Sequence, residues 1–198
     1  MEQARQAQTK MTKEQIAIVS RQIISALHYL NEREIIYGDI KPENILFKDI
    51  SNEPTFCLAN FGSSKVIDSS ANLRGTRYYL ASEVYSGGPQ DVRLDIWSFG
   101  VVIYEMLTGL ALDQLSGLTD STYISGEWHK RLENACGNTG DLAKMLTLSV
   151  ERRITIDSCY ASDTFPVLPD TLPSPFAAPA APNPPALLSS LGGGSNER

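Results

Sequence analysis

Apolar residues at helical spacing near the start of the chain predict an amphipathic helix, because a spacing of three or four places them on one face. They are Ile16, Val19, Ile23, Leu27 and Leu30. Thr12 and Gln15 precede most of this run with the spacing of a capping box, in which each side chain bonds the backbone N–H of the other residue. The sequence therefore predicts a helix over residues 12–32.

Short runs rich in β-branched and aromatic residues follow this helix. They occupy residues 35–37, 45–47 and 55–58, and turn-forming stretches such as KPEN and KDISNEP separate them. Runs of this length and composition are typical of strands. We therefore expect small paired strands.

A second helix is predicted from the run IWSFGVVIYEMLTG, which begins after Asp95 and is apolar on nearly every face. Such a pattern indicates a helix buried on all sides, and Gly109 is placed to end it. Residues 110–140 show only weak periodicity, so no element is assigned there. Residues 141–150 carry apolar positions at helical spacing and predict one more helix.

The C-terminal end has a composition that disfavours folding. Eight of the 11 prolines lie between Pro166 and Pro185, and a GGGS run follows. We expect residues 163–198 to form a disordered Pro/Ala/Gly-rich tail and residues 1–11 a flexible N-terminus, which leaves 12–162 as the domain. The composition favours a passive tail, with docking of its two PxxP steps in an SH3-type groove as the alternative.

Composition narrows the function classes. The chain has 198 residues, 42% apolar and 20% charged, enough for one ordinary domain. Its net charge is −6, from 17 Lys and Arg against 23 Asp and Glu, which disfavours nucleic acid as a partner. The most apolar stretch, residues 96–107, is too short to span a bilayer. We expect neither a membrane-spanning protein nor one that acts on nucleic acid.

The three cysteines, Cys57, Cys136 and Cys159, are widely spaced and include no CxxC pair. This spacing argues against a disulfide framework and against a zinc site. An intracellular location, cytoplasmic or nuclear, is therefore expected.

Polar motifs lie in a fixed order between and just beyond the predicted helices. They are Tyr37-Gly38-Asp39-Ile40-Lys41-Pro42-Glu43-Asn44, Asn60-Phe61-Gly62, Gly75-Thr76, Ala81-Ser82-Glu83 and Asp95-Ile96-Trp97-Ser98-Phe99-Gly100. Each is weak alone, but in this order they resemble the C-terminal lobe of a eukaryotic protein kinase of the serine/threonine type. The resemblance implies an α+β, predominantly helical fold: a protein kinase-like C-terminal lobe with small β-hairpins.

The resemblance also implies roles in ATP-dependent phosphoryl transfer to a protein. Asp39 stands at the position of the catalytic base, and Lys41 would place an ammonium on the transferring phosphate. Asn44 occupies the position of a magnesium ligand, and Leu46 that of the apolar floor beneath adenine. Lys41, Glu43, Asn44 and Leu46 are thus the expected nucleotide-binding residues, with ATP and Mg²⁺ as cofactors.

Other matching positions are structural by the same resemblance. Glu83 and Arg153 would form a buried ion pair. Asp95 would accept backbone N–H groups of the loop that carries Asp39. Tyr37 and Phe61 would stack on each other. Thr76 is a structural position as well, and with Gly75 it resembles the serine/threonine branch of the family.

Three departures from the family pattern lower the expected activity. Asn60 stands where the family has a magnesium-binding aspartate, which removes one negative charge. Gly38 replaces an arginine that pairs with a phosphorylated activation loop, so phosphates on Ser69, Ser70 or Thr76 would lack that partner. Neither a GxGxxG loop nor a VAIK-like lysine precedes residue 12, so we expect the N-terminal lobe to be missing and ATP binding to be weak.

Three hypotheses follow from these residues. The chain is a serine/threonine protein kinase family member with impaired catalysis, or a pseudokinase-like scaffold that binds proteins, or a truncated fragment without function. A protein substrate or binding partner is expected in the first two, and the apolar face left by a missing N-terminal lobe is a candidate contact surface.

Overall fold

Helix α2 (Lys13–Asn31) opens the part of the chain that the structure, a computed structural model, describes. The described residues are 10–50, 53–67, 75–88, 90–110, 112, 119–137, 140–170 and 172. The Thr12 side chain accepts the backbone N–H of Gln15, and the Gln15 side chain accepts that of Thr12. The predicted helix and its capping box are confirmed.

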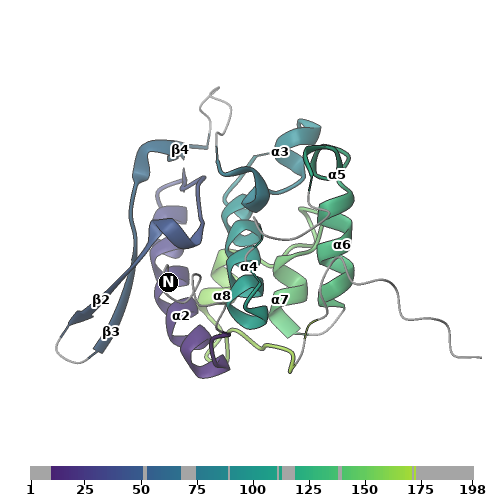
Figure 1. Cartoon of the computed structure of the whole chain (residues 1–198). Helices are drawn as coiled ribbons and strands as arrows, with labels where there is room; N and C mark the ends of the chain where they lie inside the picture. Colours follow the sequence, from purple (N-terminus) through teal and green to yellow (C-terminus); the bar gives the residue numbers. More distant parts are fainter. Residues whose placement is uncertain are drawn as a thin grey trace, which may run out of the picture.

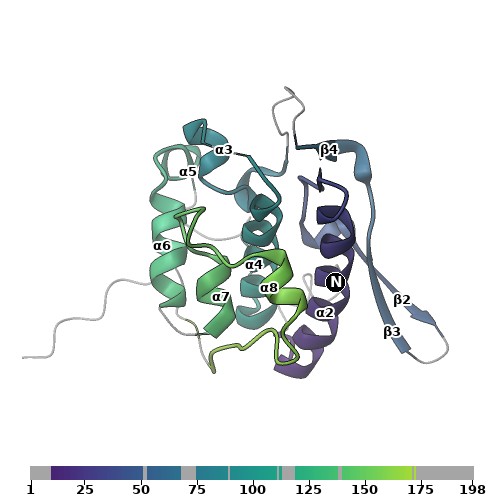
Figure 2. The same cartoon turned by 180° about the vertical axis from the view of Figure 1, so that it is seen from behind.

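Helix α4 (Arg93–Thr108) runs through the middle of the protein and is buried along almost its whole length. It lies between α2 on one side and α7 (Gly140–Met145) on the other (Figures 1 and 2). A helix that is apolar on every face must be surrounded in this way, and the prediction of a central buried helix ending at Gly109 is confirmed. None of the described helices is long and apolar enough to cross a membrane.

Two small antiparallel sheets lie beside α2. In the first, β2 (Ile45–Ile50) pairs with β3 (Glu53–Leu58), which confirms the predicted strands there. In the second, β1 (Ile35–Ile36) pairs with β4 (Lys65–Val66), a partner too short to be predicted. Tyr37, expected in the first strand, lies just after it.

The β2–β3 hairpin is attached to α2 through one side chain. Gln22 donates to the Pro54 carbonyl at 2.9 Å and accepts the Phe56 N–H at 2.7 Å. The hairpin extends along and beyond the helix at one side of the protein (Figure 1). Four short elements lie in loops. They are η1 (Pro42–Asn44) between β1 and β2, η2 (Phe61–Ser63) between β3 and β4, and η3 (Arg77–Tyr79) and α3 (Glu83–Ser86) between β4 and α4.

Residues 110–140, to which no element was assigned, contain two helices, α5 (Asp120–Ile124) and α6 (Glu127–Cys136). Trp128, Leu132 and Cys136 of α6 are buried and lie four residues apart. That spacing is typical of a helix. It did not lead to a predicted helix because polar residues surround it and both helices are short. The described part is predominantly helical with two small sheets, as the expected fold class states.

The helix predicted over residues 141–150 is shorter than expected, because α7 ends at Met145. Residues 147–153 turn back instead, and the Arg153 N–H donates to the carbonyls of Ser149 and Val150. A further helix, α8 (Ile156–Tyr160), follows with Thr155 as its N-cap. A helix of five residues carries too little periodicity to be predicted.

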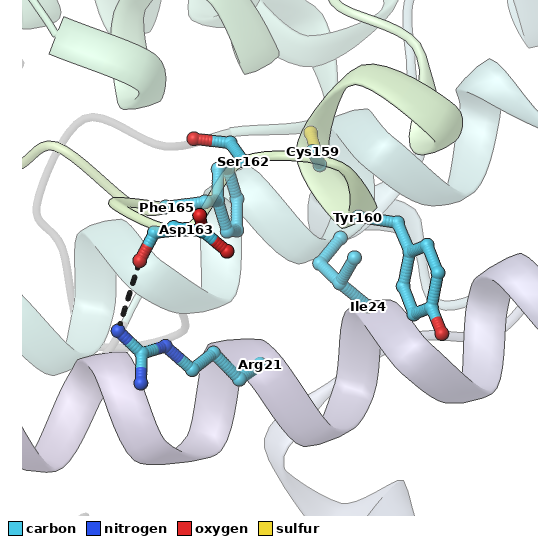
Figure 3. A pocket seen from close by; sticks show the side chains of 7 residues that line it. All are labelled: Arg21, Ile24, Cys159, Tyr160, Ser162, Asp163 and Phe165. Atoms are coloured by element: carbon cyan, nitrogen blue, oxygen red, sulfur yellow. Dashed lines mark hydrogen bonds between the residues drawn. The ribbon is translucent and has the colours of Figure 1, made fainter.

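The packed part of the chain continues past residue 162, where the tail was expected to begin. Phe165 is buried, the Val167 N–H donates to Asp141 at 2.8 Å, and Arg21 on α2 donates to the Asp163 carbonyl at 3.1 Å. A cavity of about 250 Å³ lies between α2 and this segment, with Ile24 and Phe165 among its lining residues (Figure 3). Residue 171 and residues 173–198 of the expected tail lie outside the described part.

Candidate active site

The loop between β1 and β2 carries the candidate catalytic residues. Asp39 is 8% exposed and Asn44 is 6% exposed. The Asn44 amide donates to the Asp39 backbone carbonyl at 2.8 Å and to its carboxylate Oδ2 at 2.9 Å. Because Asn44 ends the short turn η1, its side chain reaches back to Asp39 and fixes the carboxylate.

Lys41 and Thr76 complete the surroundings of the Asp39 carboxylate. Lys41 Nζ lies 3.0 Å from Asp39 Oδ2 and donates to Thr76 Oγ1 at 2.6 Å. Thr76 donates to Asp39 Oδ1 through its backbone N–H at 2.9 Å and its hydroxyl at 2.8 Å. The structure thus brings together four predicted site residues from two segments, around a carboxylate whose two oxygens both accept hydrogen bonds.

Asp95, at the start of α4, binds the backbone of this loop. It accepts the backbone N–H of Tyr37 at 2.7 Å and that of Gly38 at 2.9 Å, the contacts that the family resemblance implies. Burial raises the pKa of the Asp95 carboxyl to about 6, although the two N–H donors work in the opposite direction. The carboxylate is therefore costly to bury but well placed to satisfy two loop donors. Gly38 has a φ of 84°, a left-handed conformation that glycine adopts without strain.

Asn60 and Phe61 lie next to this loop, after β3. Asn60 has a left-handed backbone with φ of 60°, a conformation that asparagine tolerates. Its amide nitrogen faces Asn44 Oδ1 at 3.5 Å. Phe61 contacts Tyr37 edge to face, with ring centroids 5.2 Å apart, rather than stacking in parallel. Burial, with the charges of Asp39 and Asp95, raises the pKa of the Tyr37 phenol, which donates to the Ala59 carbonyl.

The donor set at the two expected magnesium positions fits the ion poorly. Mg²⁺ takes anionic oxygen ligands in preference to neutral ones, and here both positions are amides. The side-chain oxygen of Asn44 faces the amide nitrogen of Asn60. Within the described residues, no three His, Cys, Asp or Glu side chains are gathered in the manner of a metal site.

The remaining nucleotide-binding candidates lie at the edge of the cluster. Glu43 is an exposed residue of η1. Leu46 is on β2 and is 50% exposed. Their expected roles in nucleotide binding depend on the family resemblance.

Glu83 and Arg153 form the buried ion pair expected from the sequence. Arg153 donates from both terminal nitrogens to both carboxylate oxygens of Glu83, one bond measuring 3.1 Å, and the two side chains are almost inaccessible to solvent. Arg153 also donates to the Arg93 carbonyl at 3.0 Å. The pair therefore ties α3 to the turn after α7 and to the start of α4.

Several side chains missed by the sequence analysis fasten the segment that bears Thr76. The Tyr79 carbonyl accepts from Ser98 Oγ at 2.8 Å, and the Tyr79 hydroxyl donates to Glu105 at 2.9 Å. Tyr123 and His129 reach the next carbonyl, that of Leu80. No local spacing could reveal these contacts, because the partners lie 19 to 49 positions apart in the sequence.

Comparisons with known proteins agree with this arrangement. A family model described as "Protein kinase domain" matches residues 1–165. The "Serine/threonine-protein kinase pak-2" of Caenorhabditis elegans is 42% identical over 105 residues, 51% of this chain and 20% of that protein. The "Serine/threonine-protein kinase atg1" of Dictyostelium discoideum is 34% identical over 158 residues, 76% of this chain and 23% of that protein. The chain spans about a fifth to a quarter of the length of these relatives.

Proposed function

The chain belongs to the protein kinase family, and from this premise we propose that it is a serine/threonine-type kinase domain whose phosphoryl transfer is impaired at Asn60. The observation that carries this proposal is the contact between the Asn60 amide nitrogen and Asn44 Oδ1. It puts two neutral amides where the reaction needs charge to bind metal.

The loop itself supports phosphoryl transfer. Asp39, held by Asn44 and Thr76, is placed to accept a proton from a substrate hydroxyl. Lys41 lies beside it and offers a positive charge to the oxygen atoms of a transferring phosphate. Asn44 would offer an oxygen ligand to Mg²⁺, whereas Asn60 presents an amide in place of an anionic ligand.

Asn60 is the reason to expect slow transfer. Replacing a carboxylate by an amide at a metal ligand removes one unit of negative charge, which costs several kcal/mol of metal binding or transition-state stabilisation as an order of magnitude. Asp39, which Asn44 links to Asn60, already pairs with Lys41, so its negative charge does not replace the one that is missing at Asn60.

The substitution Asn60→Asp tests this proposal. A carboxylate there should raise Mg²⁺-dependent phosphate transfer from ATP by about a hundredfold or more, because each 1.4 kcal/mol changes the rate about tenfold. It should also strengthen Mn²⁺ binding in the presence of ATP, measured by electron paramagnetic resonance. Asp39→Asn in the Asn60→Asp background is the control and should abolish the gained transfer.

Two results would contradict the proposal. One is a wild-type chain that transfers phosphate as fast as Asn60→Asp, with both activities lost on Asp39→Asn. The other is Mn²⁺ and ATP binding that is equal in the wild type and in Asn60→Asp. The binding measurement decides the question even where neither protein turns over.

A second candidate is a protein-binding module, favoured by apolar side chains exposed near the site. Leu46, Phe47 and Phe61 are each half exposed. Exposed apolar side chains that form a patch are typical of contact surfaces. This function would survive Asp39→Asn but should weaken when Phe47→Ser and Phe61→Ser reduce the exposed apolar surface, as measured by comparing the proteins that the wild type and these variants capture from a cell lysate.

A further inference from the structure

The Leu80 carbonyl accepts two side-chain hydrogen bonds from helices outside the catalytic loop. Tyr123 Oη on α5 donates at 2.9 Å, and His129 Nε2 on α6 lies 3.0 Å away. The two rings also contact each other, with centroids 4.9 Å apart. A single backbone oxygen is thus fixed from two helices, at the end of the segment that begins with Thr76.

The segment from Thr76 to Leu80 is short, and backbone hydrogen bonds connect its residues. Fixing one end of the segment therefore restrains the other end. The Tyr79 N–H donates to the Thr76 carbonyl at 3.0 Å, and the Leu80 N–H donates to the Arg77 carbonyl at 3.3 Å. At its other end, Thr76 donates twice to the Asp39 carboxylate. If the hydrogen bonds to the Leu80 carbonyl were lost, Thr76, one turn of backbone away, would be less firmly held against Asp39.

The surroundings of His129 favour its neutral form. The side chain is 1% exposed, and its Nδ1 has no hydrogen-bond partner among the described residues. A neutral ring with its hydrogen on Nε2 donates to Leu80 and leaves Nδ1 as a lone pair. Protonation would keep the Nε2 hydrogen bond but would create a buried N–H on Nδ1 without an acceptor, which disfavours the anchored position.

The groups around His129 do not offset a positive charge. Glu83 faces it from α3, but that carboxylate is already paired with Arg153. Tyr123 from α5 uses its hydroxyl on Leu80, and Tyr85 contacts Tyr123. On α4 the neighbour is the Trp97 ring, 5.4 Å from the imidazole between centroids. Burial accordingly lowers the pKa of His129, with Arg153 adding to the effect and Glu83 and the Leu80 carbonyl opposing it.

We propose that His129 and Tyr123 are positioning residues that hold Thr76 against Asp39 through the Leu80 carbonyl, and that this anchor weakens on acidification. The inference deepens the proposed function, since it assigns a control to the same site. It concerns the geometry of the site and not the metal, so it stands or falls separately from the role of Asn60.

The direction of the pH effect follows from proton binding. An anchored His129 has a pKa below that of a released one, whose ordinary value is about 6.5. Below about pH 6.5 the released form binds a proton that the anchored form does not, so acid favours release. Release should rise with falling pH by up to about tenfold per pH unit, because one proton is involved. Above that pH the anchor should be insensitive.

Amide hydrogen exchange on the full chain tests the anchor without ATP or metal. After correction for intrinsic rates, the protection of amides in residues 75–81 should fall about tenfold between about pH 7 and about pH 5.5, relative to those of α4. His129→Gln keeps a neutral donor and should remove this pH dependence. Tyr123→Phe should lower protection at both pH values. The matched control is His28→Gln, which replaces the other of the two histidines and should leave the profile unchanged.

If the His129→Gln variant does not fold, the protonation state of His129 can be measured in the wild type instead. In the wild type, ¹⁵N chemical shifts should show His129 neutral with its hydrogen on Nε2 at about pH 6. The proposal is overturned if His129 carries its hydrogen on Nδ1 or titrates at the ordinary value. It is equally overturned if His129→Gln retains the pH-dependent loss of protection, or if His28→Gln abolishes it.

Discussion

Gly75 brings two segments of the site closer together than a side chain would allow. A Cβ atom at this position would lie 2.5 Å from the Gly38 carbonyl oxygen and 2.6 Å from the Leu80 Cδ2 atom. The first contact is with backbone of the catalytic loop, which Asp95 holds in place. The segment that carries Thr76 can therefore approach Asp39 only because residue 75 is glycine.

Gly75→Ala should destabilise the protein by about 1–3 kcal/mol, the usual cost of inserting a methyl group into a tightly packed position. Urea unfolding followed by circular dichroism measures the change. Gly62→Ala is the matched control, since its Cβ would meet only the Asn60 side chain at 3.4 Å, an ordinary contact. Equal effects of the two substitutions would show that the close approach at residue 75 carries no cost.

The Glu83–Arg153 pair links elements that the chain separates by 70 positions. Arg153 lies over the Trp97 ring of α4 at 5.2 Å from its centroid, in addition to its bonds to Glu83 and the Arg93 carbonyl. The guanidinium thus joins α3, α4 and the turn after α7. The pair therefore holds α3 against the helical core.

Arg153→Met should lower the free energy of unfolding by about 3–5 kcal/mol, because it leaves the Glu83 carboxylate buried without its partner. The chain offers an exposed pair for comparison, Glu127 and Arg131 on α6. Arg131→Met should cost at most about 0.5 kcal/mol. Denaturant unfolding of both variants measures the difference. A similar loss of unfolding free energy in both would mean that burial does not determine how much an ion pair stabilises this protein.

The sequence predicts the long elements well and the short ones poorly, for a physical reason. Helices α2 and α4 are long enough for their apolar pattern to repeat several times. Each also has one recognisable boundary, since Thr12 caps the start of α2 and Gly109 ends α4. Helices α5 and α8 have five residues each, so they complete little more than one turn. Their stability comes from tertiary packing, which local spacing does not encode.

The candidate site divides in the same way. Asp39, Lys41 and Asn44 lie in one loop, so their motif alone places them near one another. That Thr76 bonds Asp39, and that Leu80 is held by His129, depends on how distant segments fold together. The family resemblance implied Asp95 and the Glu83–Arg153 pair, whereas nothing in the sequence pointed to the anchors of residues 79 and 80.

The C-terminal segment closes the helical body by lying across elements from both ends of the chain. Asp141 and Val167 form two hydrogen bonds. The Asp141 carboxylate accepts the Val167 N–H, and the Asp141 backbone N–H donates to the Val167 carbonyl at 2.9 Å. Lys13, at the start of α2, donates to the Leu168 carbonyl at 3.1 Å and pairs with Asp170. Pro166 is buried as well, which removes the first PxxP step from the surface available to an SH3-type groove.

Phe165 should be the residue that makes this segment part of the folded body. Its ring is 2% exposed, whereas Val167 nearby is 49% exposed. Phe165→Ala should cost about 3–5 kcal/mol through lost burial and the cavity it leaves, while Val167→Ala should cost less than about 1 kcal/mol. Thermal and urea unfolding of the two variants, with protease digestion to detect release of residues 163–170, tests this difference.

If Phe165→Ala were as stable as Val167→Ala, residues 163–170 would not contribute to the stability of the fold, and the folded domain would end near residue 162. A large and selective loss instead places the end of the cooperative unit at or beyond Asp170, because contacts from α2 and α7 would then be lost together.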